Sequence, residues 1–146
     1  MKKILILYDG SELSDRALEK GKELAKAFGS DVLILNIVSN PFLNAYIGKR
    51  PTPIVGADQL FQEIVKEAEE MLAKAKDSLK DLTGKVDTLI LEGDPANRII
   101  DFIEAEDIDL VVIGYHGLGA RINRFLMGSL TTKLLHHVKK PVLVVK

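Results

Sequence analysis

The chain has 146 residues, a net charge of −1 and no cysteine, and 47% of its residues are hydrophobic and 28% charged. This length suits one domain with one core, and the small net charge gives no field that would draw the chain to nucleic acid or to a membrane surface. The lack of cysteine excludes disulfides and thiolate chemistry, no apolar run could span a bilayer, and the first residues do not resemble a secretory signal, so we expect a cytoplasmic protein.

Five apolar stretches rich in β-branched residues are predicted to be strands. They lie at residues 3–8, 32–38, 86–91, 110–113 and 141–145. Their hydrophobicity is nearly continuous rather than alternating, which is typical of strands that are buried on both faces of a parallel sheet.

Helical patterns separate these stretches. Gly29 is predicted to end the first helix, and Asp94 followed by Pro95 is predicted to begin the third. The expected buried faces are Ala17, Leu18, Gly21, Leu24, Ala25 and Phe28 in the first helix, Ile64, Ala68, Met71, Leu72, Ala75 and Leu79 in the second, Ala96, Ile99, Ile100 and Ile103 in the third, and Leu130, Leu134, Leu135 and Val138 in the fourth.

The alternation of strands and helices predicts an α/β fold with one domain over residues 1–146. We expect a doubly wound, parallel, five-stranded sheet in the order 3-2-1-4-5 with helices on both faces. In such sheets, ligands bind outside the carboxyl ends of the strands, where the strand order reverses. Those ends carry Asp9-Gly10-Ser11 and Gly114-Tyr115-His116-Gly117, so the ligand site is expected between the first and fourth strands.

One segment, residues 41–57, shows no convincing period and holds three of the five prolines. We predict a mobile loop here, because structureless stretches of this length are usually mobile or functional. Two interpretations stay open. The segment is either a simple connection or, given apolar residues such as Phe42 and Tyr46, a lid or a flap that contacts a partner.

Four glycines, at positions 114, 117, 119 and 128, cluster near the end of the chain. They match neither a dinucleotide-binding fingerprint nor a Walker A loop. Gly128-Ser129 precedes a helical pattern, where free amides and the helix dipole favour an anion. Plain turns with Ser129 as a helix cap are the rival interpretation, and spacing alone does not decide between the two.

Two further residues are candidates at these strand ends. Asp9 is a candidate ligand of a ribose or a metal, although an Asx turn with Gly10 is favoured by the local sequence. His116, expected to be exposed in a loop, is either a phosphate contact or a histidine without a role. We find no Ser/His/Asp set and no carboxylate pair at the strand ends, so we expect no dedicated catalytic activity.

Two long stretches resemble the universal stress protein family. KKILILYDGSELSDRAL is similar to the opening strand, aspartate turn and first helix of that family, and VVIGYHGLGARINRFLMGSLTTKLLHHVKKPVLVVK is similar to its C-terminal signature. The ATP-binding members carry G-x2-G-x9-G-[ST]. This chain has ten residues between Gly117 and Gly128, so its glycine loop is one residue longer than the usual motif.

The resemblance implies that the chain binds ATP, with or without Mg2+ or Mn2+. It implies that Gly114, Gly117, Gly128 and Ser129 hold the phosphates and ribose, and that Leu130 and Thr131 extend the amide contacts into the helix. It also implies that Asp9 meets the nucleotide from the first strand and that Ile37 lies against adenine.

The resemblance further implies a stress-response protein that acts as a dimeric regulatory switch. The homodimer would form through the last strand, from Pro141 to Val145, since an apolar edge strand usually pairs or is protected. An unidentified protein partner is also expected. The alternatives are an interaction module of the same fold that needs no nucleotide, and a slow ATP hydrolase or phosphotransfer protein.

Overall fold

A parallel sheet of five strands forms the centre of the molecule. The computed structural model describes residues 1–39, 46–47, 50–51, 56–116 and 128–146. The sheet runs in the order β5-β2-β1-β6-β7. Its strands are β1 (Lys3–Leu7), β2 (Asp31–Val38), β5 (Val86–Glu92), β6 (Leu110–Gly114) and β7 (Val142–Val145). This is the order 3-2-1-4-5 among the five predicted strands, so the predicted fold class is confirmed.

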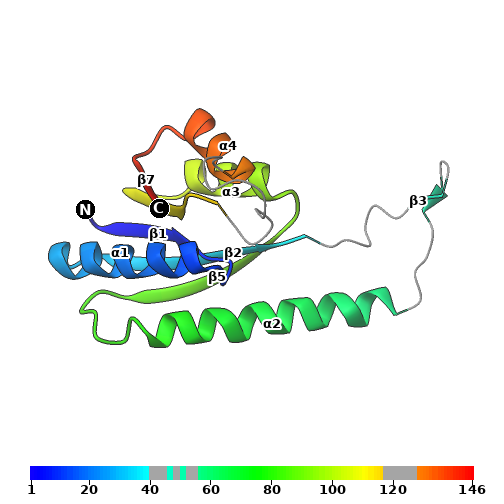
Figure 1. The fold of residues 1–146 in the computed structure, drawn as a ribbon, viewed down its shortest axis with the longest axis horizontal. Coiled ribbons are helices and arrows are strands. Elements are labelled where there is room, and N and C mark those ends of the chain that lie inside the picture. Colours follow the sequence, from blue (N-terminus) through cyan, green and yellow to red (C-terminus); the bar gives the residue numbers. More distant parts are fainter. Residues whose placement is uncertain (40–45, 48–49, 52–55, 117–127) are drawn as a thin grey trace.

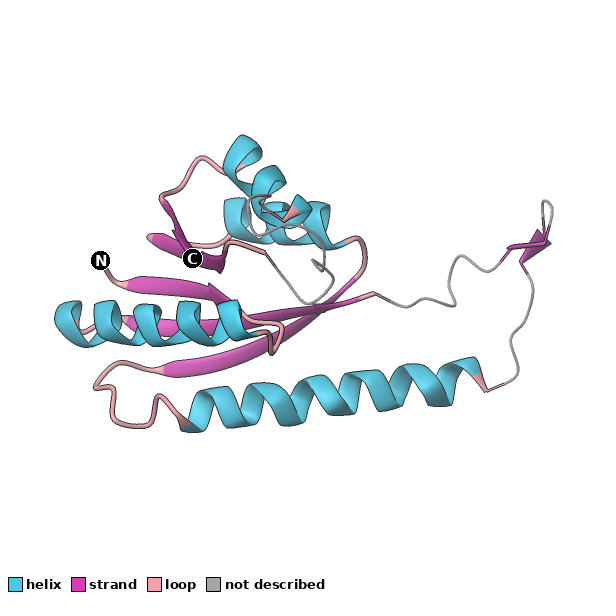
Figure 2. Cartoon of the chain, in the orientation of Figure 1, coloured by secondary structure: helices cyan, strands magenta, loops and turns pink. Residues whose placement is uncertain are grey.

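Two layers of helices cover the sheet, one on each face (Figure 1). α1 (Glu12–Phe28) and α2 (Ala57–Asp77) lie on one face, and α3 (Pro95–Ala105) and α4 (Ser129–His137) lie on the other. Figure 2 shows the sheet between these two pairs of helices. No helix among the described residues has the length and apolar character needed to cross a membrane.

The central strand β1 shows why its sequence is continuously apolar. Ile4 and Ile6 pack into the core under α1 and α2, whereas Leu5 and Leu7 pack into the core under α3 and α4. All four side chains are buried. A strand with a hydrophobic core on each face has no position for a polar side chain, which is the pattern read from the sequence.

Two predicted helix boundaries are confirmed. Gly29 follows α1 with φ of +64°, and its N–H donates to the carbonyl of Ala25. Asp94 precedes α3, and its side chain accepts a hydrogen bond from the N–H of Asn97, with Pro95 as the first helical residue. Both ends follow from local chemistry, because glycine tolerates the left-handed region and a carboxylate satisfies a free amide.

Two residues expected on buried faces are exposed. Phe28 is 58% exposed, because the last turn of α1 extends past the strands (Figure 1). Leu135 is 43% exposed, since the neighbouring Leu134 takes the inward position on α4. Leu79 is buried as expected, but it lies in the turn after α2 rather than within the helix.

The segment expected to lack structure contains one short antiparallel pair. β3 (Tyr46–Ile47) pairs with β4 (Arg50–Pro51), and α2 begins at Ala57 after Gly56, whose φ is +79°. Residues 40–45, 48–49 and 52–55 lie outside the described part of the chain. The mobility of residues 41–57 therefore stays a prediction.

Candidate functional site

The carboxyl ends of β1, β2 and β6 lie side by side, and the strand order reverses between β1 and β6. Leu7 is in register with Leu35, and Ile6 with Val112. Asp9 follows β1, Ile37 is half-buried near the end of β2, and Gly114 is the buried last residue of β6. The three predicted positions therefore share one edge of the sheet, which is where an open α/β sheet binds its ligand.

The turn between β1 and α1 is closed by its own hydrogen bonds. The Oδ1 atom of Asp9 accepts a hydrogen bond from the N–H of Ser11 at 2.9 Å, and Gly10 has φ of +80°. Ser11 in turn caps α1, because its Oγ accepts from the N–H of Ser14 at 3.2 Å. The Asx turn favoured by the sequence is confirmed, and a contact from Asp9 to a ribose or metal stays a prediction.

Contacts from α1 and α2 fix this turn further. The hydroxyl of Tyr8 donates to Oδ1 of Asp15 at 2.5 Å. Burial, this hydrogen bond and the negative charges of Asp15 and Asp9 raise the pKa of Tyr8 to about 12. A Cβ placed on Gly10 would lie 2.9 Å from the sulfur of Met71. Sequence reasoning missed these contacts, since they join residues from different elements.

The start of α4 is built differently. Gly128 precedes the helix without any side-chain cap, and its N–H donates to the carbonyl of Tyr115 at 2.8 Å. Ser129 is the exposed first residue of the helix rather than its cap. The first turn of α4 carries no acidic residue. Its free amides and the helix dipole are thus available to an anion.

Thr131 joins α4 to the end of β6. The residue is 2% exposed, and its Oγ1 donates to the carbonyl of Gly114 at 2.9 Å. Leu130 is half-buried and packs against the core on the α3 and α4 face. The hydroxyl of Thr131 is therefore committed to the fold, whereas the main-chain amides of Leu130 and Thr131 stay candidates for ligand contacts.

The structure gives two of the glycines a packing role. A Cβ on Gly114 would lie 3.1 Å from the carbonyl carbon of Leu13, and a Cβ on Gly128 would lie 3.0 Å from the Cα of His116. From the sequence, these glycines were explained either by turns or by the close approach of a ligand to the backbone. The close packing of backbone against backbone is a third reason for glycine at these two positions. Gly117 lies outside the described residues.

His116 is half-buried, so the expectation of an exposed histidine is wrong. Its ring meets Tyr115 edge-on with the centroids 6.2 Å apart, and its backbone packs against Gly128. Within the described part of the chain its buried Nδ1 finds no hydrogen-bond partner. A buried polar atom without a partner is uncommon and is often explained by a ligand or water.

These features together fit a phosphate group. The exposed hydroxyl of Ser129 and the amides of the first turn of α4 could donate to its oxygens, and no carboxylate in that turn would repel it. Among the described residues, no three or more His, Cys, Asp or Glu side chains form a group that could hold a metal ion.

Known proteins resemble this chain along its whole length. The profile of the universal stress protein family matches residues 1–146. Universal stress protein MJ0531 of Methanocaldococcus jannaschii is 35% identical over 99% of this chain and 82% of its own length. The solved structure of universal stress protein UspA from Lactobacillus plantarum is 22% identical, with a TM-score of 0.85 over 99% of this chain and 97% of its own.

A further solved structure has a bound nucleotide. It is the universal stress protein from Archaeoglobus fulgidus in complex with dAMP, which is 24% identical with a TM-score of 0.68 and covers 100% of this chain and 98% of its own. At this identity the likeness establishes the shared fold. From the match of the family profile to the whole sequence and from the M. jannaschii relative, it follows that the chain belongs to the universal stress protein family.

Proposed function

We propose that the chain binds an adenine nucleotide, ATP foremost, in the crevice between the ends of β1 and β6. The observation that carries this proposal is the start of α4, which has no side-chain cap and packs against the backbone of His116, whose buried Nδ1 finds no partner among the described residues. The dAMP complex of the A. fulgidus protein supports the choice of an adenine nucleotide.

Several of the predicted residues have a part in this proposal. The phosphates lie at the amides that follow Gly128 and at the hydroxyl of Ser129, where the helix dipole stabilises negative charge. Asp9 contacts the ribose or a metal, and Ile37 lies against adenine. Mg2+ or Mn2+ would bind largely through the phosphates, as is usual for Mg2+.

The same proposal includes a homodimer that acts as a regulatory switch in a stress response, without dedicated catalysis. In the described part of the chain, β7 is the last strand of the sheet and pairs with β6 alone. Tyr115 and Val111 donate to the carbonyls of Val145 and Pro141. Because main-chain groups alternate along a strand, those of Val142 and Val144 point to the outer edge, where a second copy can pair.

Calorimetric titration with ATP and with AMP, in the presence of magnesium, tests nucleotide binding. We expect Ser129→Ala to weaken ATP binding about tenfold, since it removes one hydrogen bond to a charged group. Ser78→Ala is the matched control, because Ser78 is an exposed serine at the C-terminal end of α2, where no helix begins. Wild-type protein that binds neither nucleotide would leave only the interaction module.

Sedimentation at micromolar concentration tests the dimer. Val144→Pro removes an N–H that points to the outer edge and leaves the hydrogen bonds to β6 in place, so we expect a folded monomer. A wild-type chain that sediments as a monomer would contradict the homodimer while leaving nucleotide binding intact.

A further inference from the structure

One residue outside the predicted site, Tyr115, connects two parts of the molecule through its main chain. Its N–H donates to the carbonyl of Val145 at 2.8 Å, and its carbonyl accepts from the N–H of Gly128 at 2.8 Å. The end of β7 is therefore hydrogen-bonded to the N–H of Tyr115, and the start of α4 to its carbonyl.

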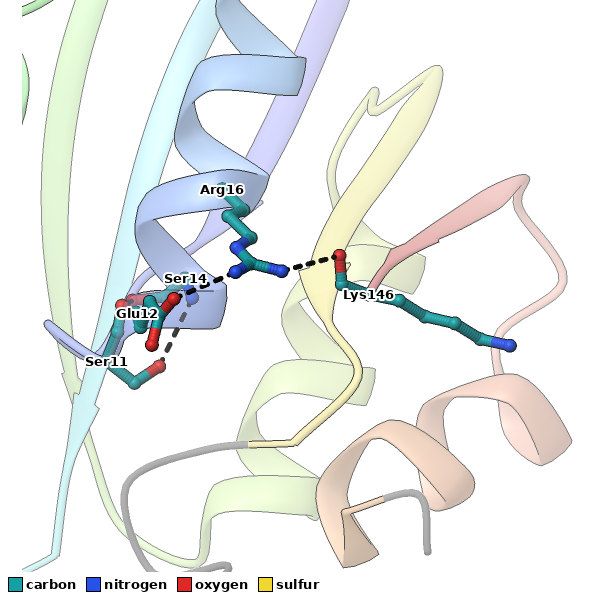
Figure 3. A network of polar contacts seen from close by, with 5 residues as sticks. All are labelled: Ser11, Glu12, Ser14, Arg16 and Lys146. Carbon is teal, nitrogen blue, oxygen red and sulfur yellow. Dashed lines mark hydrogen bonds and ion pairs between the residues drawn. The ribbon is translucent and has the colours of Figure 1, made fainter. Parts of the chain in front are cut away.

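The side chains around Tyr115 strengthen the β7 end of this connection. The Nζ atom of Lys146 lies 5.4 Å from the centroid of the Tyr115 ring, a cation–π distance. Arg16 of α1 reaches the same place, with its Nη1 atom 3.4 Å from the main-chain oxygen of Lys146 and its Nη2 atom 2.8 Å from Glu12 (Figure 3). The last residues of the sheet are thus held by α1 and by the ring of Tyr115.

On the other side, Tyr115 leads directly into the candidate site. His116 follows it, and the backbone of His116 packs so closely against Gly128 that a Cβ there would lie 3.0 Å from the Cα of His116. Displacement of Tyr115 would move the carbonyl that holds Gly128 and the ring of His116, whose Nδ1 atom has no partner among the described residues. The geometry of the start of α4 therefore depends on how Tyr115 is held.

We propose that Tyr115 and Lys146 are positioning residues of the nucleotide site, through which the end of edge strand β7 and the nucleotide influence each other. This inference rests on the proposed nucleotide binding. Neither residue touches the ligand. Each acts through Gly128 and His116, and because the linkage is reciprocal, a nucleotide bound at α4 also stabilises the end of β7.

The test uses the full chain, with ATP as the probe. Lys146→Ala should weaken ATP binding about two- to fivefold, the size of an exposed cation–π contact, and Lys146→Arg should restore it. Lys133→Ala is the control, because it removes the same charge from the exposed face of α4 itself. If charge alone mattered, the control would weaken binding at least as much.

Amide hydrogen exchange at Tyr115 provides a second measurement, which separates the positioning effect from the simple loss of a positive charge near the ligand. The N–H of Tyr115 should exchange more slowly when ATP binds, and faster in free Lys146→Ala protein than in wild type, with Lys133→Ala unchanged. If wild type and Lys146→Ala bind ATP with the same affinity and show the same exchange rate at Tyr115, the inference is overturned and the proposed function still stands. Wild type that binds no nucleotide overturns both.

Discussion

Two helices begin at the same edge of the sheet, and they treat their free amides in opposite ways. α1, after β1, is capped by Ser11 and has Glu12 and Asp15 in its first turn. α4, which follows β6, is preceded by Gly128 and has no capping side chain and no acid in its first turn. The dipole of each helix places partial positive charge at the crevice, but only α1 neutralises that charge with its own residues.

This difference supports the proposed place of the anion at the start of α4. α3 resembles α1, since Asp94 caps it. Position at the edge of the sheet is therefore shared by helix starts that are capped by their own side chains and by one that is not. Among the helices that follow β1, β5 and β6 in the described chain, α4 is the one whose first amides have no capping side chain to accept their hydrogen bonds.

The largest expected effect comes from making the start of α4 resemble that of α1. Ser129→Asp places a carboxylate in its first turn, so ATP affinity should fall roughly a hundredfold through the lost hydroxyl and charge repulsion. The same carboxylate should stabilise the helix by about 0.3–1 kcal/mol. Calorimetry and urea unfolding measure the two effects, which have opposite signs.

Ser129→Asn is the control for this change, because it has a similar size and no charge. If Ser129→Asp binds ATP as tightly as the asparagine variant, the start of α4 is not the anion site.

A second effect concerns the hydrogen bond that joins α4 to β6. Thr131→Val removes a buried hydroxyl and leaves the carbonyl of Gly114 without that donor, so the free energy of unfolding should fall by about 1–3 kcal/mol. Urea unfolding measures this loss. Thr132→Val offers a comparison, because Thr132 donates to Gly128 from a less buried position. An unchanged midpoint for Thr131→Val would show that the bond contributes nothing.

Replacement of the two serines at the helix starts should change the stability of the protein by different amounts. Ser11→Ala removes the cap of α1 and should cost about 1 kcal/mol, whereas Ser129→Ala removes no cap and should cost nothing measurable. Thermal unfolding of the two variants side by side tests this prediction. Equal losses of stability in the two variants would contradict the difference in capping between the starts of α1 and α4.

The last effect is confined to alkaline pH, at the closed turn. Tyr8 has a pKa of about 12 in the folded chain against 10.0 when unfolded, so the folded state holds this proton more tightly. The resulting stabilisation is complete below pH 10 and is lost as the pH rises from 10 to 12. Tyr8→Phe should unfold with a shallower pH dependence in that range, and identical profiles would contradict the shift.

Much of the fold could be predicted because its signals are local. Continuous apolar stretches, the glycine after α1 and the aspartate–proline pair before α3 each act within a few residues, and the order of the elements then limits the topology. Phe28 and Leu135 were expected to be buried because periodicity gives a face of a helix but not the extent of the sheet beneath it.

The candidate site could be predicted only in part, for the same reason. Asp9 and Ser129 were found from turn and helix-start chemistry. The contacts of Gly114 with Leu13 and of Tyr115 with Val145 join distant parts of the chain, and no local pattern announces them. His116 was expected to be exposed, because a loop sequence does not show what packs over it.

The central place of β1 also has a consequence for how the protein is made. β1 is synthesised first, yet Ile4 must pair with Leu110, which leaves the ribosome late. Until then one edge of a strand that is apolar on both faces has no neighbour. Such an edge invites pairing between nascent chains, so truncation before β6 should give an aggregating product, and native folding must wait for most of the chain to be translated.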